Sequence, residues 1–188
     1  MFAPSDAVFT AMLIAAGCFA LLDWWAVVAR HKHAEYVAKP GMTAACLLAA
    51  AFSKAPVDAQ RSWWVLALFF CLLGDVFLMF DRWRDRSHFL YGLGSFFLGH
   101  VFFVVGFAVR GWNTSQVLIS VLAVGIFGAS LLLLLIRGAI AKGHQEMVVP
   151  LCLYVSVITL MMSGAIGAGP AIAIVGAALF MLADSMIG

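Results

Sequence analysis

Residues 115–136 read SQVLISVLAVGIFGASLLLLLI, an apolar stretch without a single acidic or basic residue. A helix of this length rises about 33 Å, enough to cross the hydrocarbon core of a bilayer. Six further apolar runs lie along the chain, and together they predict seven transmembrane helices, over residues 8–29, 40–52, 63–80, 89–109, 115–136, 147–167 and 171–187. Helices are favoured over a barrel because the runs are continuous, and a helix satisfies its own backbone hydrogen bonds in lipid. The predicted fold is therefore all-α, a polytopic transmembrane bundle forming one integral membrane domain over residues 1–188.

The composition excludes the other broad classes of protein. Of the 188 residues, 65% are hydrophobic and only 11% are charged. A soluble domain is roughly 45–50% apolar and about 25% charged, and a disordered chain is more polar still. The formal net charge of +2 is too small to indicate a nucleic-acid partner. The partner that remains is membrane lipid.

The distribution of basic residues predicts the orientation of the bundle. Eight of the eleven Lys and Arg residues fall in the loops that follow the first, third and fifth predicted spans. Basic loops stay in the cytoplasm, so we expect the N-terminus outside and those three loops inside. Short loops and a compact chain favour a bacterial inner membrane.

Ionisable residues inside the predicted spans mark the candidate site, because such residues are costly in lipid and usually functional. Asp75 and Asp184 lie in the third and seventh spans, which run in the same direction, so both carboxyl groups reach a similar depth in the cytoplasmic half. His100 lies near the middle of the fourth span. The supporting candidates are Asp23, Lys39, Tyr91, Tyr154 and Ser185. We therefore expect a polar cavity that opens toward the inner leaflet.

Several of these residues also have a purely structural interpretation. Asp23 is near enough to the interface to be solvated there, and Lys39 is placed to anchor the chain by snorkelling. Tyr91 and Tyr154 fit packing or belt positions, and His100 fits a satisfied core histidine. Asp75 and Asp184 are the hardest to explain by structure alone.

Two carboxyl groups in one apolar cavity suit acid–base chemistry, since one stays protonated while its partner ionises. This arrangement fits cleavage through an oxocarbenium ion, as in glycoside hydrolysis. A serine hydrolase is not indicated, because the chain has no GxSxG motif. A catalytic zinc site is also not indicated, because it needs about three protein ligands and only His100 lies well inside a span. No metal or organic cofactor is expected.

Several short strings stand in a characteristic order along the chain: Lys39-Pro40 before the second span, Leu73-Gly74-Asp75 in the third, Gly92 to His100 in the fourth, and Leu179-Phe180 with Asp184-Ser185 in the seventh. In their order and spacing, these strings resemble the YhhN family of lysoplasmalogenases. The resemblance implies an integral membrane hydrolase whose substrates are lysoplasmalogens and whose catalytic pair is Asp75 and Asp184. The products would be a fatty aldehyde and glycerophosphoethanolamine or glycerophosphocholine.

The resemblance also has two departures and leaves one rival class open. Family members usually have eight spans, one more than the seven predicted here, and a Tyr often stands where this chain has Phe103. The rival class is a small-solute or proton-coupled transporter, in which buried Asp and His side chains would relay protons or bind a cation. Against a transporter, the charges gather in one half of the membrane and no inverted repeat is evident.

Overall fold

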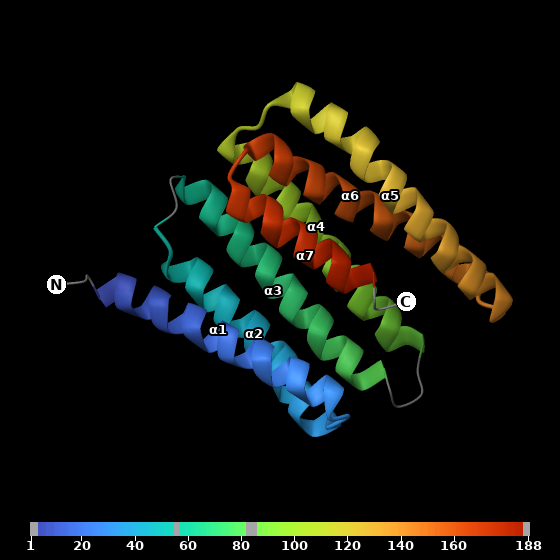
Figure 1. The fold of residues 1–188 in the computed structure, drawn as a ribbon, viewed down its shortest axis with the longest axis horizontal. Helices are drawn as coiled ribbons and strands as arrows, with labels where there is room; N and C mark the ends of the chain where they lie inside the picture. Colours follow the sequence, from blue (N-terminus) through green and yellow to red (C-terminus); the bar gives the residue numbers. More distant parts are fainter. Residues whose placement is uncertain (1–3, 55–56, 82–85, 186–188) are drawn as a thin grey trace. The chain divides into compact units, whose positions relative to one another are not determined.

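The computed structural model describes residues 4–54, 57–81 and 86–185 of the chain. These residues form seven α-helices and one short 3₁₀ turn (Figure 1), namely α1 (Pro4–Val28), α2 (Lys32–Phe52), α3 (Asp58–Asp81), α4 (Arg86–Arg110), α5 (Thr114–Ala141), η1 (Gln145–Met147), α6 (Val148–Ala168) and α7 (Ala171–Ser185). The described part of the chain contains no β-strand. The all-α prediction is therefore confirmed.

Most of these helices suit a bilayer by length and composition. Five are both long and apolar enough to cross a membrane: α1, α3, α4, α5 and α6 with the turn before it. Helix α7 is apolar but shorter, and α2 carries more charge in its first half. The protein is thus a multi-pass membrane protein built from helices.

The second helix differs most from its prediction. It begins at Lys32 and not at Pro40, so Lys39 and Pro40 lie inside the helix. The first half of α2 is charged, so a search for apolar runs does not find it. Glu35 and Lys39, one turn apart, nevertheless form an ion pair that supports a helix. The Nδ1 atom of His31 accepts a hydrogen bond from the Ala34 backbone N–H and caps the first turn.

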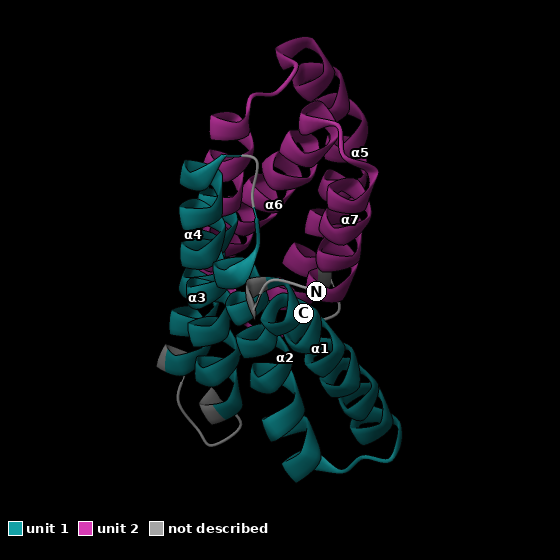
Figure 2. Ribbon diagram, turned by 90° about the vertical axis from the view of Figure 1, so that its left-hand side faces the viewer, with its two compact units in different colours: residues 1–102 teal, residues 103–188 magenta. Residues whose placement is uncertain are grey.

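The chain divides into two compact units, residues 1–102 and 103–188, shown in different colours in Figure 2. The division falls within α4. The first unit contains α1, α2, α3 and the first part of α4, and the second contains the end of α4 with α5, α6 and α7.

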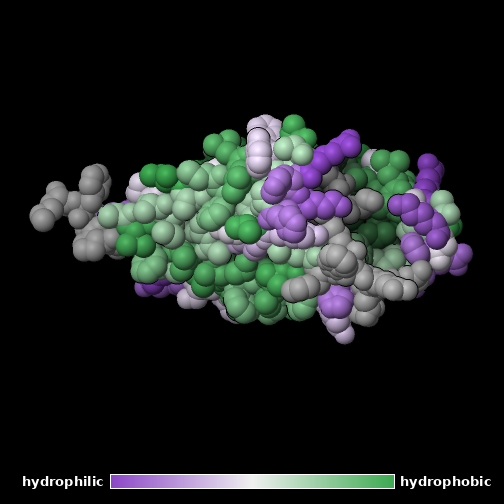
Figure 3. All heavy atoms as spheres, turned by 90° about the horizontal axis from the view of Figure 1, so that it is seen from below, coloured by the Kyte–Doolittle hydropathy of each residue, from purple (hydrophilic) through white to green (hydrophobic). Residues whose placement is uncertain are grey.

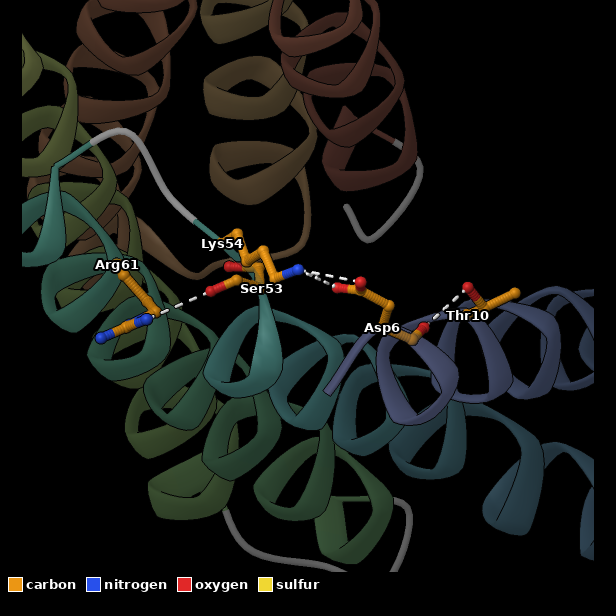
Figure 4. A network of polar contacts seen from close by, with 5 residues as sticks. All are labelled: Asp6, Thr10, Ser53, Lys54 and Arg61. Atoms are coloured by element: carbon orange, nitrogen blue, oxygen red, sulfur yellow. Dashed lines mark hydrogen bonds and ion pairs between the residues drawn. The ribbon is translucent and has the colours of Figure 1, made fainter. Parts of the chain in front are cut away.

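In the first unit, α1 and α2 pack as an antiparallel pair. The start of α1 is joined to the residues just after α2 by an ion pair of 2.7 Å between an Asp6 carboxylate oxygen and Lys54 Nζ (Figure 4). At the same end, the Arg61 guanidinium donates to the Ser53 carbonyl and connects the start of α3 to the end of α2. Along the pair, Gly41 lets the helices approach closely, because a Cβ atom there would lie 2.8 Å from the Phe19 ring.

Helices α3 and α4 touch through glycines. A Cβ atom on Gly74 would lie 2.6 Å from the ring of Phe96, and one on Gly99 would lie 2.8 Å from Cys71 Sγ. Real Cβ atoms essentially never show contacts as short as these two. The small residues bring the two backbones together, as in other membrane helix pairs, and they fix the segment of α3 that carries Asp75.

The second unit is held in a similar way. Helix α6 packs between α5 and α7 and supplies most of the buried residues that the structure describes in this unit. A Cβ atom on Gly128 of α5 would lie 2.7 Å from Thr159 Oγ1 of α6. The tight packing around α6 positions the helix face that carries Tyr154.

Large apolar side chains remain exposed on the outer helices. Leu122 and Ile126 of α5 are each 73% exposed, and Ile172 of α7 is 85% exposed. Hydrophobic residues cover much of the face drawn in Figure 3, and hydrophilic residues gather in separate patches. Such a surface is stable only when lipid covers it.

Candidate active site

The first unit places Asp75 of α3 against Thr43 of α2. The Thr43 hydroxyl donates a hydrogen bond of 2.5 Å to Asp75 Oδ2. Thr43 is 8% exposed and Asp75 is half-buried. A hydrogen bond to an ionised carboxylate is stronger than one between two neutral groups. This bond therefore fixes one oxygen of the Asp75 carboxyl group.

The local sequence explains why α2 can come so near to Asp75. Among the described residues of α2, the buried ones are Thr43 and three alanines, Ala38, Ala45 and Ala49. Small side chains let a neighbouring helix approach. On α3, Gly74 precedes Asp75 and lies against Phe96 of α4. The carboxyl group therefore belongs to a segment that is packed on both sides.

The first half of α2 carries a charged cluster. Lys39 Nζ lies 3.6 Å from Glu35 Oε1, and the Lys39 side chain is 47% exposed. Asp23 of α1 lies within electrostatic range of both residues. One oxygen of Asp23 is buried and has no hydrogen-bond partner among the described residues. Asp23 and Lys39, both predicted as supporting residues, thus lie within electrostatic range of each other.

His100 is the most deeply buried predicted site residue, with 0% of its surface exposed. Its Nδ1 atom lies 2.7 Å from the Phe96 carbonyl oxygen. Because a carbonyl only accepts, Nδ1 carries the hydrogen, and in the neutral ring Nε2 is the acceptor nitrogen. The ring orientation is therefore set by the backbone of its own helix.

Tyr91 lies on the outer surface of α4. It is 59% exposed, and its ring is 5.8 Å from the ring of Phe77 and 6.5 Å from that of His88. This environment agrees with the interpretation of Tyr91 as a packing or belt residue. A supporting role for Tyr91 stays a prediction.

The second unit joins two of the predicted residues directly. The Tyr154 hydroxyl of α6 donates a hydrogen bond of 2.7 Å to Asp184 Oδ2 of α7. Tyr154 is 7% exposed and Asp184 is half-buried. The two residues come from helices that are neighbours in the fold but 30 positions apart in the chain. The side chain of Ser185 lies outside the described residues.

Both candidate carboxyl groups thus accept a hydrogen bond from a buried hydroxyl group, from Thr43 in one unit and from Tyr154 in the other. The meeting of Asp75 with Asp184 stays a prediction, since the two residues belong to different units. Sequence reasoning missed Thr43. Its only sequence signal is a hydroxyl residue in an alanine-rich helix, and such residues often bond their own helix backbone instead.

Comparison with known proteins identifies the family of this chain. The sequence profile of the YhhN family matches residues 34–188, which is most of the chain. The chain belongs to the YhhN family. The matched range includes Asp75, His100, Tyr154 and Asp184.

Two curated relatives of this YhhN protein carry the name lysoplasmalogenase. One is from Mycobacterium bovis and the other from Mycobacterium tuberculosis, and each is 32% identical over 149 residues. The alignment covers 77% of this chain and 55% of each relative, so the chain spans about half the length of the curated relatives it matches. No solved structure matches this YhhN protein.

Proposed function

We propose that this protein hydrolyses the vinyl ether bond of lysoplasmalogens within the membrane. The products are a fatty aldehyde and glycerophosphoethanolamine or glycerophosphocholine. The observation that carries the proposal is that both candidate aspartates accept a hydrogen bond from a buried hydroxyl group on a neighbouring helix. Membership of the YhhN family and the name of the two mycobacterial relatives support the choice of substrate.

The reaction requires one acid and one base, and Asp75 with Asp184 supplies both. The protonated carboxyl group donates its proton to the vinyl ether carbon remote from oxygen, and the adjacent carbon becomes an oxocarbenium centre. The ionised carboxylate stabilises this cation and accepts a proton from the water that attacks it. The first step creates positive charge, so an adjacent carboxylate in a low-dielectric site lowers its barrier.

The resulting hemiacetal then collapses. The carboxyl group that received the proton from water returns a proton to the glycerol oxygen, and the bond between this oxygen and the former vinyl carbon breaks. The hemiacetal hydroxyl gives its proton to the other carboxylate. Both aspartates regain their starting states, and one water molecule is consumed.

The remaining predicted residues fit supporting roles in this scheme. The alkenyl chain lies among apolar side chains in the membrane, and the head group lies toward the predicted cytoplasmic side. Lys39 is exposed and carries a positive charge suited to the lipid phosphate. His100, with its ring held by the Phe96 carbonyl, orients water or one carboxyl group. We place the protein in a bacterial inner membrane.

The test is a direct assay on the full chain, purified and reconstituted in lipid. Lysoplasmenylethanolamine is the substrate, and the lysolipid with a saturated ether at the same position is the matched control. We expect aldehyde from the vinyl ether only, because the saturated ether has no carbon that can accept the proton. In ¹⁸O-labelled water the glycerophosphoethanolamine should contain no label, because water attacks the alkenyl carbon. Release of no aldehyde would contradict the proposal.

A further inference from the structure

The buried face of α2 contains one hydroxyl group among alanines. Ala38, Ala45 and Ala49 are each at most 5% exposed, and Thr43 is 8% exposed. Close helix packing alone is satisfied by alanine, as the other three positions demonstrate. A threonine at this place adds a hydroxyl group, and that hydroxyl is directed at Asp75 on the neighbouring helix.

The Thr43 hydroxyl has two acceptors within reach. Asp75 Oδ2 lies at 2.5 Å, and the carbonyl oxygen of Lys39, one turn earlier in α2, lies at 3.4 Å. The short distance identifies the aspartate as the principal partner, since hydrogen bonds weaken beyond about 3 Å. The usual bond from a helical threonine to its own backbone is therefore the secondary one here.

These two acceptors allow Thr43 to serve Asp75 in both protonation states. When Asp75 is ionised, Thr43 donates to it. When Asp75 is protonated, its own O–H donates to Thr43 Oγ1, and the threonine hydrogen turns to the Lys39 carbonyl. The Asp75 oxygen keeps its place while a proton arrives or leaves. A group that exchanges a proton in each catalytic cycle needs such a partner.

We infer that Thr43 is a positioning residue that holds the Asp75 carboxyl group in its reactive orientation throughout the cycle. The inference rests on the proposed function, because it assigns Thr43 to the same vinyl ether hydrolysis. Thr43 itself exchanges no proton with the substrate. Its loss should therefore lower kcat and leave KM nearly unchanged.

The experiment compares Thr43→Val, which removes the hydroxyl but nearly keeps the shape, with Thr43→Ser, which keeps the hydroxyl. Thr159→Val is the matched control, because Thr159 is also 8% exposed and lies on α6 against Gly128. We expect Thr43→Val to lose roughly 10- to 100-fold in kcat, the range for a hydrogen bond to a charged group, because Asp75 is ionised at one stage of the cycle. Thr43→Ser should stay within a few-fold of the wild type, and Thr159→Val should be unaffected.

The possible results separate this inference from the proposed function. An active wild type with an equally active Thr43→Val variant overturns the inference and leaves the function standing. Equal losses in Thr43→Val and Thr43→Ser also overturn it, since they would reflect packing. A wild type that releases no aldehyde overturns the proposed function, and this inference with it. If Thr43→Val does not fold, Thr43→Ser and Thr43→Ala decide, because they differ only in the hydroxyl.

Discussion

The hydrogen bond between Tyr154 and Asp184 allows a quantitative prediction for the substitution Tyr154→Phe. The change removes one hydroxyl and keeps the aromatic ring, which is buried in the second unit. The lost contact is a 2.7 Å bond to a carboxyl oxygen. In the proposed cycle each aspartate is ionised at one stage, and a hydrogen bond to an ionised carboxylate contributes about 1.5–3 kcal/mol. The rate of aldehyde release should therefore fall roughly 10- to 100-fold.

The assay is the initial rate of aldehyde release from lysoplasmenylethanolamine by the reconstituted chain. Tyr36→Phe is the matched control, because it removes the same group from a tyrosine that has no part in the proposed chemistry. Thermal unfolding of both variants monitors the fold. A Tyr154→Phe variant with the wild-type rate would refute the assignment of Tyr154 as the partner that holds Asp184 for reaction.

Two further substitutions test the packing and the charged cluster. Gly74→Ala should destabilise the protein by about 1–3 kcal/mol, because the new Cβ atom meets the Phe96 ring. Gly94→Ala is the control and should not lower the unfolding temperature, because a Cβ atom there enters open space. Equal unfolding temperatures for these two variants would contradict the close approach of α3 and α4. Lys39→Gln should raise KM about two- to fivefold and leave kcat nearly unchanged, since we propose that this exposed cation binds the head group and not the reacting atoms. An unchanged KM in steady-state assays would exclude that role.

Much of the fold follows from the sequence because lipid imposes a simple rule. Backbone groups in hydrocarbon must be satisfied internally, so long apolar runs become helices. The predictable part ends where charge enters a helix. The first half of α2 was predicted to be a loop because it contains the charged residues Lys32, Glu35 and Lys39. Pro40 was predicted to begin the helix, but it lies inside it.

The candidate site was predictable for ionisable residues, because placing such a side chain in lipid has a high free-energy cost. Asp75, Asp184 and His100 stand out for that reason. Tyr154 was also predicted as a supporting residue, and the structure shows its hydroxyl bonded to Asp184. Thr43 was not predictable, because a threonine in a membrane helix costs little and its partner lies 32 positions away. Identifying that pair requires the register of α2 against α3, which apolar periodicity does not determine.

The central proposal is that Asp75 and Asp184 act together as a catalytic pair. The most direct measurement is the rate of aldehyde release by Asp75→Asn, Asp184→Asn and the double variant, each with its fold verified by thermal unfolding. Each single variant should lose all activity above background, and the double variant should be no worse, because residues that act as a unit are strongly non-additive. Wild-type activity in either single variant, or losses that multiply in the double variant, would contradict it.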